Sequence, residues 1–219
     1  MKFLYTVSMS RYIRQLINQG EGQTLDFKYE ISDAYKIARS LAAFSNTDGG
    51  KLLIGVKDNG NINGIQSEEE YYMIEAAAQL YCKPEVRFTF RRWDIEGKTI
   101  LEIDIPKAKK KPYFAKTSEG KWLAYIRVKD QNLLANRVLL KIWEKEKSNK
   151  GNWIRYGEAE KKLLDYLQNN PHITLSKFSR IAKIPLKKAE EILVNLILPG
   201  ILEMEFTEKA VYYRLKKKT

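Results

Sequence analysis

The sequence predicts an α+β protein with two domains, a larger mixed-sheet domain followed by a smaller one. Within the first two thirds of the chain, short runs with strand-like alternation are interleaved with segments of helical periodicity. A polar segment that contains glycine and lacks periodicity follows at 148–152, which indicates a linker. Beyond it the pattern changes to three amphipathic helices and two short alternating strands.

The elements of the first domain follow from local patterns. We expect helices near 11–18, 34–46, 68–80 and 133–146 and strands near 24–29, 51–57, 86–94, 98–105 and 122–128. Ser32 or Asp33 can cap the second helix. The apolar run KLLIGV at 51–56 is typical of a strand covered on both faces, and Gly55 within it indicates a close approach by another backbone or a ligand.

The second domain, 153–219, begins with helices near 158–168, 175–184 and 186–197, the second capped by Thr174. The segment from 201 to 215 alternates as a β-hairpin. Three helices and a hairpin are the pattern of a winged helix, a variant of the helix-turn-helix. The expected organisation is a first domain at 1–147, a linker at 148–152 and a winged helix at 153–219.

Composition narrows the function classes. The 219 residues carry a formal net charge of +12, which favours an anionic partner such as nucleic acid. No apolar run approaches the ~20 residues that span a bilayer, and the first residues do not resemble a secretion signal, so we expect a cytoplasmic protein without membrane contact. The single cysteine, Cys82, excludes an internal disulfide and a cysteine-based zinc site. The single histidine, His172, argues against a histidine-rich metal cluster and a Ser-His-Asp triad.

Several motifs together resemble one family. They are Glu21, LDFK at 25–28, AFSNTDGG at 43–50, LIGVKDNGNINGI at 53–65, KPYFA at 111–115 and YIRV at 125–128. They resemble the Schlafen AlbA domain family over roughly residues 10–146. The resemblance implies an α+β domain proposed to bind nucleic acid, which in bacteria often precedes a winged helix in proteins described as transcriptional regulators. Nucleases of the family pair two such lobes in one chain, so the single lobe here implies a homodimer.

The resemblance also implies an alternative function. RNA-cleaving members of the family use three carboxylates, and Glu21, Asp26 and Asp58 match their order, with Asp26 standing where the pattern has a glutamate. Clustered carboxylates suit Mg²⁺ or Mn²⁺, and a bound metal would activate water against a phosphodiester. The alternative to a metal-dependent ribonuclease is structural: Asp26 pairs with Lys28 or a helix end, Asp58 begins a turn, and Glu21 is solvated.

Basic residues provide the candidate binding surface. The segment 107–129 carries eight lysines and arginines against one acid, with aromatic residues interleaved. Such a mixture suits phosphates and exposed bases. The nucleic-acid-binding candidates are Lys28, Lys109, Lys110, Lys111, Lys116, Arg127 and Lys129, with Lys187 and Lys188 at the start of the third winged-helix helix.

These observations favour a nucleic-acid-binding protein that acts as a DNA-binding transcriptional regulator, with DNA preferred over RNA and no cofactor required. The metal-dependent ribonuclease is the runner-up, because the carboxylate spacing supports it. A protein-interaction adaptor is third, because the mixed charge of the second domain also suits a protein partner.

Overall fold

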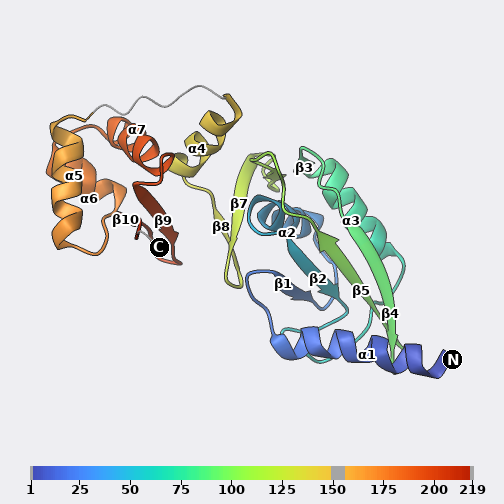
Figure 1. Cartoon of the computed structure of the whole chain (residues 1–219). Helices are drawn as coiled ribbons and strands as arrows, with labels where there is room; N and C mark the ends of the chain where they lie inside the picture. Colours follow the sequence, from blue (N-terminus) through green and yellow to red (C-terminus); the bar gives the residue numbers. More distant parts are fainter. Residues whose placement is uncertain (1, 149–155, 218–219) are drawn as a thin grey trace. The chain divides into compact units, whose positions relative to one another are not determined.

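A computed structural model of the chain describes residues 2–148 and 156–217 (Figure 1). The chain divides into two compact units, Met1–Ala135 and Asn136–Thr219, and each is described by itself. Among the helices that the structure describes, none is both long enough and apolar enough to cross a bilayer.

The first unit is built on a mixed four-stranded sheet in the order β1-β2-β5-β4. Its strands are β1 (Leu25–Lys28), β2 (Gly50–Ile54), β4 (Thr89–Ile95) and β5 (Lys98–Ile105). β1 and β2 are parallel, whereas β5 runs antiparallel to both β2 and β4. Helix α1 (Lys2–Gln19) covers one face, where Ile13 packs with Leu53 and Ile100.

A second, antiparallel sheet lies across helix α2 (Ala34–Asn46) from the first. Its order is β3-β6-β7-β8, formed by β3 (Cys82–Lys83), β6 (Phe114–Lys116), β7 (Trp122–Val128) and β8 (Gln131–Leu134). The main core joins α2 and α3 (Glu69–Leu80) to Leu52 and Leu101 of the first sheet and to Ala115 and Tyr125 of the second. The helix is therefore buried between two sheets.

The local sequence explains how α2 fits this space. Asp33 caps the helix, because its Oδ1 accepts hydrogen bonds from the backbone N–H groups of Tyr35 and Lys36 at 2.8 and 3.3 Å. Ala38, Ala42 and Ala43 are fully buried, and their small side chains allow close packing on both sides. The sequence predicted the cap as one of two candidates, and the structure selects Asp33.

Two glycines are required where backbones meet. Gly49 has φ +74°, and a Cβ there would lie 2.7 Å from both the Ile105 oxygen and the Lys107 nitrogen. At Gly55 (φ +92°) a Cβ would lie 2.8 Å from the carbonyl carbon of Gly64, so the predicted close approach is to another backbone segment. The run at 51–56 is covered on both faces, as its composition predicts, with Leu53 facing α1 and Leu52 facing α2.

The described residues of the second unit, 136–148 and 156–217, form four helices and a two-stranded antiparallel sheet. They are α4 (Arg137–Ser148), α5 (Glu158–Asn169), α6 (Leu175–Ala182), α7 (Leu186–Ile197), β9 (Leu202–Phe206) and β10 (Val211–Leu215). Thr174 caps α6 as predicted, accepting a hydrogen bond from the Lys177 N–H. An isolated antiparallel bridge joins Ile173, before α6, to Tyr213 in β10. The predicted helices and hairpin are therefore present, with a third short extended segment beside them.

The division between the units falls earlier than the sequence suggested. We expected a helix at 133–146 within the first domain, but α4 packs its Val138 and Ile142 into the core of the second unit. Lys141 of α4 also pairs with Glu190 of α7 at 2.8 Å. An amphipathic helix beside a boundary can bury its apolar face on either neighbour, and its periodicity does not say which. Of the predicted linker, residues 149–152 lie outside the described part of the chain.

Other departures concern short or edge elements. The first helix begins at Lys2 and not near residue 11, although Gly20 ends it as expected. β3, β6 and β8 were not predicted, because these strands have only two to four residues and, unlike β1, do not lie within a longer alternating run.

Candidate nucleic-acid interface

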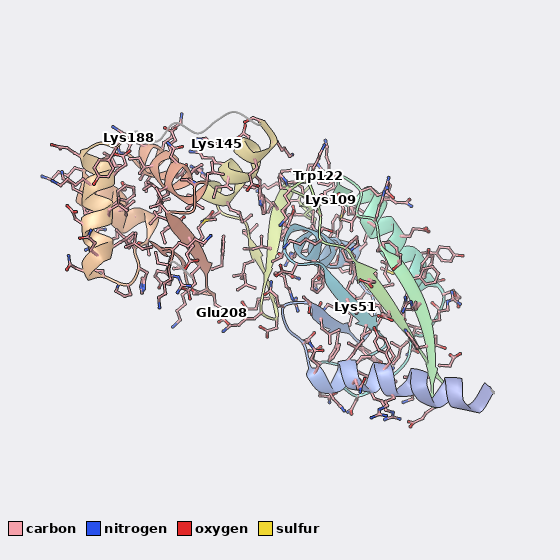
Figure 2. All side chains as sticks on the ribbon, in the orientation of Figure 1. Lys51, Lys109, Trp122, Lys145, Lys188 and Glu208 are labelled. Atoms are coloured by element: carbon pink, nitrogen blue, oxygen red, sulfur yellow. The ribbon has the colours of Figure 1, made fainter. Side chains whose placement is uncertain are left out.

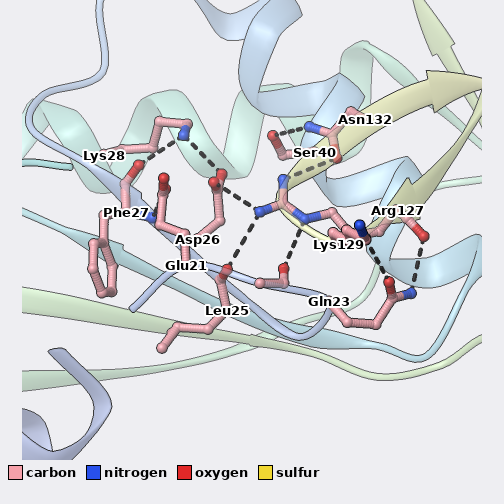
Figure 3. A network of polar contacts seen from close by, with 11 residues as sticks. Glu21, Gln23, Leu25, Asp26, Phe27, Lys28, Ser40, Arg127, Lys129 and Asn132 are labelled. Carbon is pink, nitrogen blue, oxygen red and sulfur yellow. Dashed lines mark hydrogen bonds and ion pairs between the residues drawn. The ribbon is translucent and has the colours of Figure 1, made fainter. Parts of the chain in front are cut away.

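A buried ion cluster is centred on Asp26, in the LDFK segment at 25–28 (Figure 3). Asp26 on β1 is 3% exposed, and its Oδ1 accepts a hydrogen bond from Nη2 of Arg127 on β7 at 3.1 Å. Its Oδ2 lies 2.7 Å from the Lys28 ammonium. The carboxylate thus has a cation on each oxygen, and it joins β1 of the first sheet to β7 of the second.

Every nitrogen of the Arg127 guanidinium donates a hydrogen bond. Its guanidinium also donates to the backbone oxygens of Gly22 and Leu25 and to Asn132 Oδ1, at 3.1 to 3.3 Å, and it lies over the Phe44 ring. The residue is 2% exposed. The prediction that Arg127 contacts a phosphate is therefore wrong, because the side chain would have to break several buried hydrogen bonds to reach a ligand. Arg127 connects the two sheets of the first unit.

Glu21 lies beside this cluster. Its Oε1 accepts a hydrogen bond from the Phe27 backbone N–H at 2.7 Å, so the side chain is anchored and not simply solvated. Burial, together with a hydrogen bond to the Asp26 carboxylate, raises the pKa of Glu21 to about 7. Two carboxyl groups in contact share a proton readily, because ionising both would place like charges together.

The third candidate carboxylate is in a different environment. Asp58 is exposed in the turn after β2, which is closed by a hydrogen bond from the Gly60 N–H to the Lys57 oxygen at 2.7 Å. Among the residues that the structure describes, no three His, Cys, Asp or Glu side chains are grouped so that they could hold a metal ion. The arrangement does not fit the three-carboxylate metal site, because Asp26 already pairs with two cations and Asp58 is not grouped with it.

The predicted basic segment lies in the first unit after β5. Its loop is anchored at the end of α2 by a hydrogen bond from the Ala108 N–H to the Ser45 oxygen, and Lys107 pairs with Asp48 at 3.1 Å. Lys111 extends its ammonium to within 3.5 Å of the Thr47 oxygen. Lys109, at the tip, is exposed (Figure 2). Its neighbour Lys110 is exposed as well. The loop backbone is therefore fixed while these two ammonium groups face solvent.

Asn46 fixes the other end of this segment. Its side-chain amide donates to the backbone oxygens of Tyr113 and Tyr125 at 2.7 and 2.9 Å. Its Oδ1 accepts from the Tyr113 N–H at 2.7 Å. Asn46 is 2% exposed. The motif AFSNTDGG therefore shapes the fold here, by positioning the backbone that follows residues 107–111, which we call the lysine loop.

The remaining candidates of the first unit differ in accessibility. Lys28 is half-buried and paired with Asp26, whereas Lys129 is exposed and donates its backbone N–H to Gln23 Oε1 at 2.8 Å. Lys116 is partly buried opposite the exposed Trp122 in the β6–β7 ladder. Sequence reasoning missed Gln23, which also donates to the Arg127 oxygen at 2.9 Å, because a loop glutamine carries no periodic signal.

In the second unit, Lys187 and Lys188 are both exposed in the first turn of α7 (Figure 2). The rest of that helix is largely buried, with α4 packed on it through Lys141 and Glu190. In the hairpin, Arg214 pairs with Glu203 at 2.8 Å and Glu205 at 3.5 Å. The accessible positive charge of α7 is thus confined to its beginning.

Comparison with known proteins assigns the first unit to a family. The family model described as Schlafen, AlbA_2 matches residues 21–136, and the chain therefore belongs to this family. The match includes Asp26, Asn46, Gly49 and Arg127, whose contacts hold the unit together. Family membership suggests that this unit is a nucleic-acid-binding domain.

Several solved structures match part of the chain, among them the two that follow. The DIP2311 protein from Corynebacterium diphtheriae is 21% identical, with 59% of this chain and 28% of that chain covered and a TM-score of 0.42. The N-terminal domain of a protein from Nitrosomonas europaea, described as related to the ATP-dependent DNA helicase RecG, is 22% identical. That match covers 57% of this chain and 95% of the other, with a TM-score of 0.41. No curated protein matches the chain.

We predict that Asp26→Ala lowers the free energy of unfolding by about 3–5 kcal/mol, because it leaves the Arg127 guanidinium buried without its carboxylate. The matched control is Asp58→Ala, which removes an exposed carboxylate and should change stability by about 0.5 kcal/mol or less. Urea unfolding followed by circular dichroism measures both variants. Equal effects of the two substitutions would contradict a structural role for Asp26.

A second prediction concerns pH. The pKa of Glu21, raised to about 7 from an ordinary value of 4.5, means that the folded state keeps a proton which the unfolded chain releases at lower pH. The stability contributed by this group is complete below the ordinary value and is lost as pH rises through about 7. Glu21→Gln keeps an oxygen to accept the Phe27 N–H and cannot ionise.

The free energy of unfolding of Glu21→Gln should therefore rise relative to the unsubstituted protein as the pH increases from about 5 to about 8. Urea titrations at several pH values across this interval measure the difference. A difference that stays constant with pH would show that Glu21 does not titrate in this interval.

Proposed function

We propose that the protein is a DNA-binding transcriptional regulator whose first unit contacts phosphates through the exposed cations of the lysine loop and the neighbouring strands. The observation that supports this is how the charges are partitioned. Arg127, Lys28 and Lys51 pair with carboxylates inside the fold. Lys109 and Lys110 are exposed and form no ion pair with a carboxylate of the described residues.

The physical mechanism is neutralisation of backbone phosphates with release of the counterions condensed on the nucleic acid. An ammonium with no carboxylate partner has no internal salt bridge to break before it meets a phosphate. Lys121 and Lys129 flank the same strand, β7, and are exposed in the same way. Such contacts position the protein and carry little sequence information by themselves.

The second unit is proposed to be a winged helix that supplies a further contact. Its element order supports this assignment, with α5, α6 and α7 followed by a hairpin and with Ile173 bridging to Tyr213 as a third short strand. In this fold the third helix is the reader. Lys187 and Lys188 would meet DNA with the beginning of that helix.

The ribonuclease alternative receives no support from the geometry, because Asp26 already forms ion pairs with Arg127 and Lys28 and, among the described residues, Asp58 is not grouped with it. Binding without cleavage is therefore the proposed activity. A panel of duplex DNA, single-stranded DNA and RNA, each with and without Mn²⁺, tests binding and cleavage together.

The variant Lys109→Gln/Lys110→Gln should bind duplex DNA more weakly, with the slope of log K against log salt reduced in magnitude by roughly 2, one phosphate contact for each lysine. The matched control is Lys57→Gln/Lys98→Gln, which removes the same charge from the exposed turn after β2 and the start of β5. Fluorescence anisotropy over a range of salt concentrations gives the slopes. Identical slopes for the two double variants would refute the lysine-loop contact.

The variant Lys187→Gln/Lys188→Gln is expected to weaken binding to duplex DNA by about 10-fold at moderate salt, if the start of α7 meets the DNA. Lys161→Gln on the exposed side of α5 is the control, and its effect should be small. The same anisotropy titration measures both. Unchanged binding would assign α7 to another role, such as a protein contact.

A further inference from the structure

A pocket of about 370 Å³ opens in the first unit, away from the Asp26 cluster. One wall is the beginning of α2, with Tyr35, Lys36 and Arg39. The opposite wall is the end of β6, with Lys116, and the beginning of the turn that follows it, Thr117, Ser118 and Glu119. The floor includes Leu123 and Tyr125 of β7. The pocket thus combines an apolar floor with a cationic wall.

The two cations of this wall are available to a ligand. Lys36 and Arg39 are three residues apart, which places them on one side of the helix, and both are exposed. Neither forms an ion pair with a carboxylate of the described residues, in contrast to the pairs made by Lys28, Lys51 and Lys107. An anion entering the pocket would therefore meet two charges without competing with an internal partner.

Arg39 also lies over an aromatic ring. Its guanidinium carbon lies 5.1 Å from the centroid of the Tyr125 ring. Tyr125 is 6% exposed and belongs to the main core, and its backbone oxygen accepts the Asn46 amide. A guanidinium over an aromatic ring is attracted to the face of that ring, and guanidinium planes also stack on nucleobases.

Tyr35 supplies a second ring beside the cations. It is partly buried and packs against Tyr81 with ring centroids 4.6 Å apart, so its orientation is restrained. The opposite turn is also closed, because Thr117 donates its N–H to the Lys121 oxygen and accepts from the Gly120 N–H. Little of the pocket would need to be ordered when a ligand enters.

Two carboxylates border the pocket, and neither forms an ion pair with Lys36 or Arg39. Asp33 is the helix cap and accepts the Tyr35 and Lys36 N–H groups. Glu119 is exposed in the turn and accepts a hydrogen bond from the Ser118 hydroxyl at 3.0 Å, which lowers its pKa. Glu119 therefore stays charged at neutral pH and favours ligands whose phosphate sits at the α2 wall.

We propose that this pocket receives one unpaired nucleotide of a single-stranded nucleic acid. Lys36 and Arg39 hold its phosphate, and its base stacks on the Arg39 plane or the Tyr35 ring. The volume suits a ligand of nucleotide size. A base within a duplex is stacked and paired and cannot enter a pocket of this size, whereas a single strand exposes its bases. This inference rests on the proposed binding of nucleic acid. It adds a site that distinguishes single strands from duplexes.

The test compares a labelled 12-nucleotide single strand with its duplex, by anisotropy, for Lys36→Gln/Arg39→Gln and the control Lys57→Gln/Lys98→Gln. The pocket variant should lose about 10-fold in affinity for the single strand, from one phosphate contact and one stacking contact, and change duplex binding by about 2-fold or less. Arg39→Lys, which keeps the charge and removes the plane, should lose affinity for the single strand to an intermediate extent. Circular dichroism establishes that each variant is folded.

Equal losses on the single strand and the duplex would overturn the proposal, since they would indicate a general charge effect. The second arm of the test measures the binding of adenosine monophosphate. If it binds as tightly as the single strand and this binding is lost in Lys36→Gln/Arg39→Gln, the ligand is a free nucleotide and the proposed single-stranded ligand is wrong. If the unsubstituted protein binds no nucleic acid, the proposed function itself fails. If Lys109→Gln/Lys110→Gln weakens binding while the pocket variant does not, only the pocket inference fails.

Discussion

The first unit depends on one buried ion pair, between Asp26 on β1 and Arg127 on β7. These residues are 101 positions apart, and they join two sheets that share no backbone ladder. A buried guanidinium is tolerated only if its hydrogen-bonding groups are satisfied, and here backbone oxygens, Asn132 and the carboxylate satisfy them. This pair gives the acidic residue of the LDFK segment at 25–28 a structural role.

Helix α2 is the second element on which both sheets rely. Its interior is apolar, but its end is polar: Asn46 holds the backbone of Tyr113 and Tyr125, and Thr47 Oγ1 accepts the Arg127 N–H at 2.8 Å. The same few residues therefore position the lysine loop, the floor of the pocket and the buried arginine. The lysine loop and the pocket are thus linked through the end of α2.

Much of this arrangement could be predicted from local sequence. Asp33 as one of two possible caps, Gly55 at a backbone contact and the doubly covered strand at β2 each have a cause within a few residues. Arg127 could not be placed in this way. In the sequence YIRV it alternates with apolar residues, and that pattern is the same whether its partner is a phosphate or a carboxylate far along the chain. The same limit applies to α4, whose apolar face fits either unit until the packing of Val138 is known.

The net charge of +12 is therefore a poor guide to the nucleic-acid-binding surface until each cation is located in the structure. Arg127, Lys28, Lys51 and Lys141 are all engaged by carboxylates within the two units, and counting them as binding residues overstates the surface. What remains exposed in the first unit includes the tip of a fixed loop and the wall of a pocket beside aromatic rings, together with scattered cations such as Lys57 and Lys98. A fixed loop tip suits the regular phosphates of a duplex, while a walled pocket suits a single nucleotide.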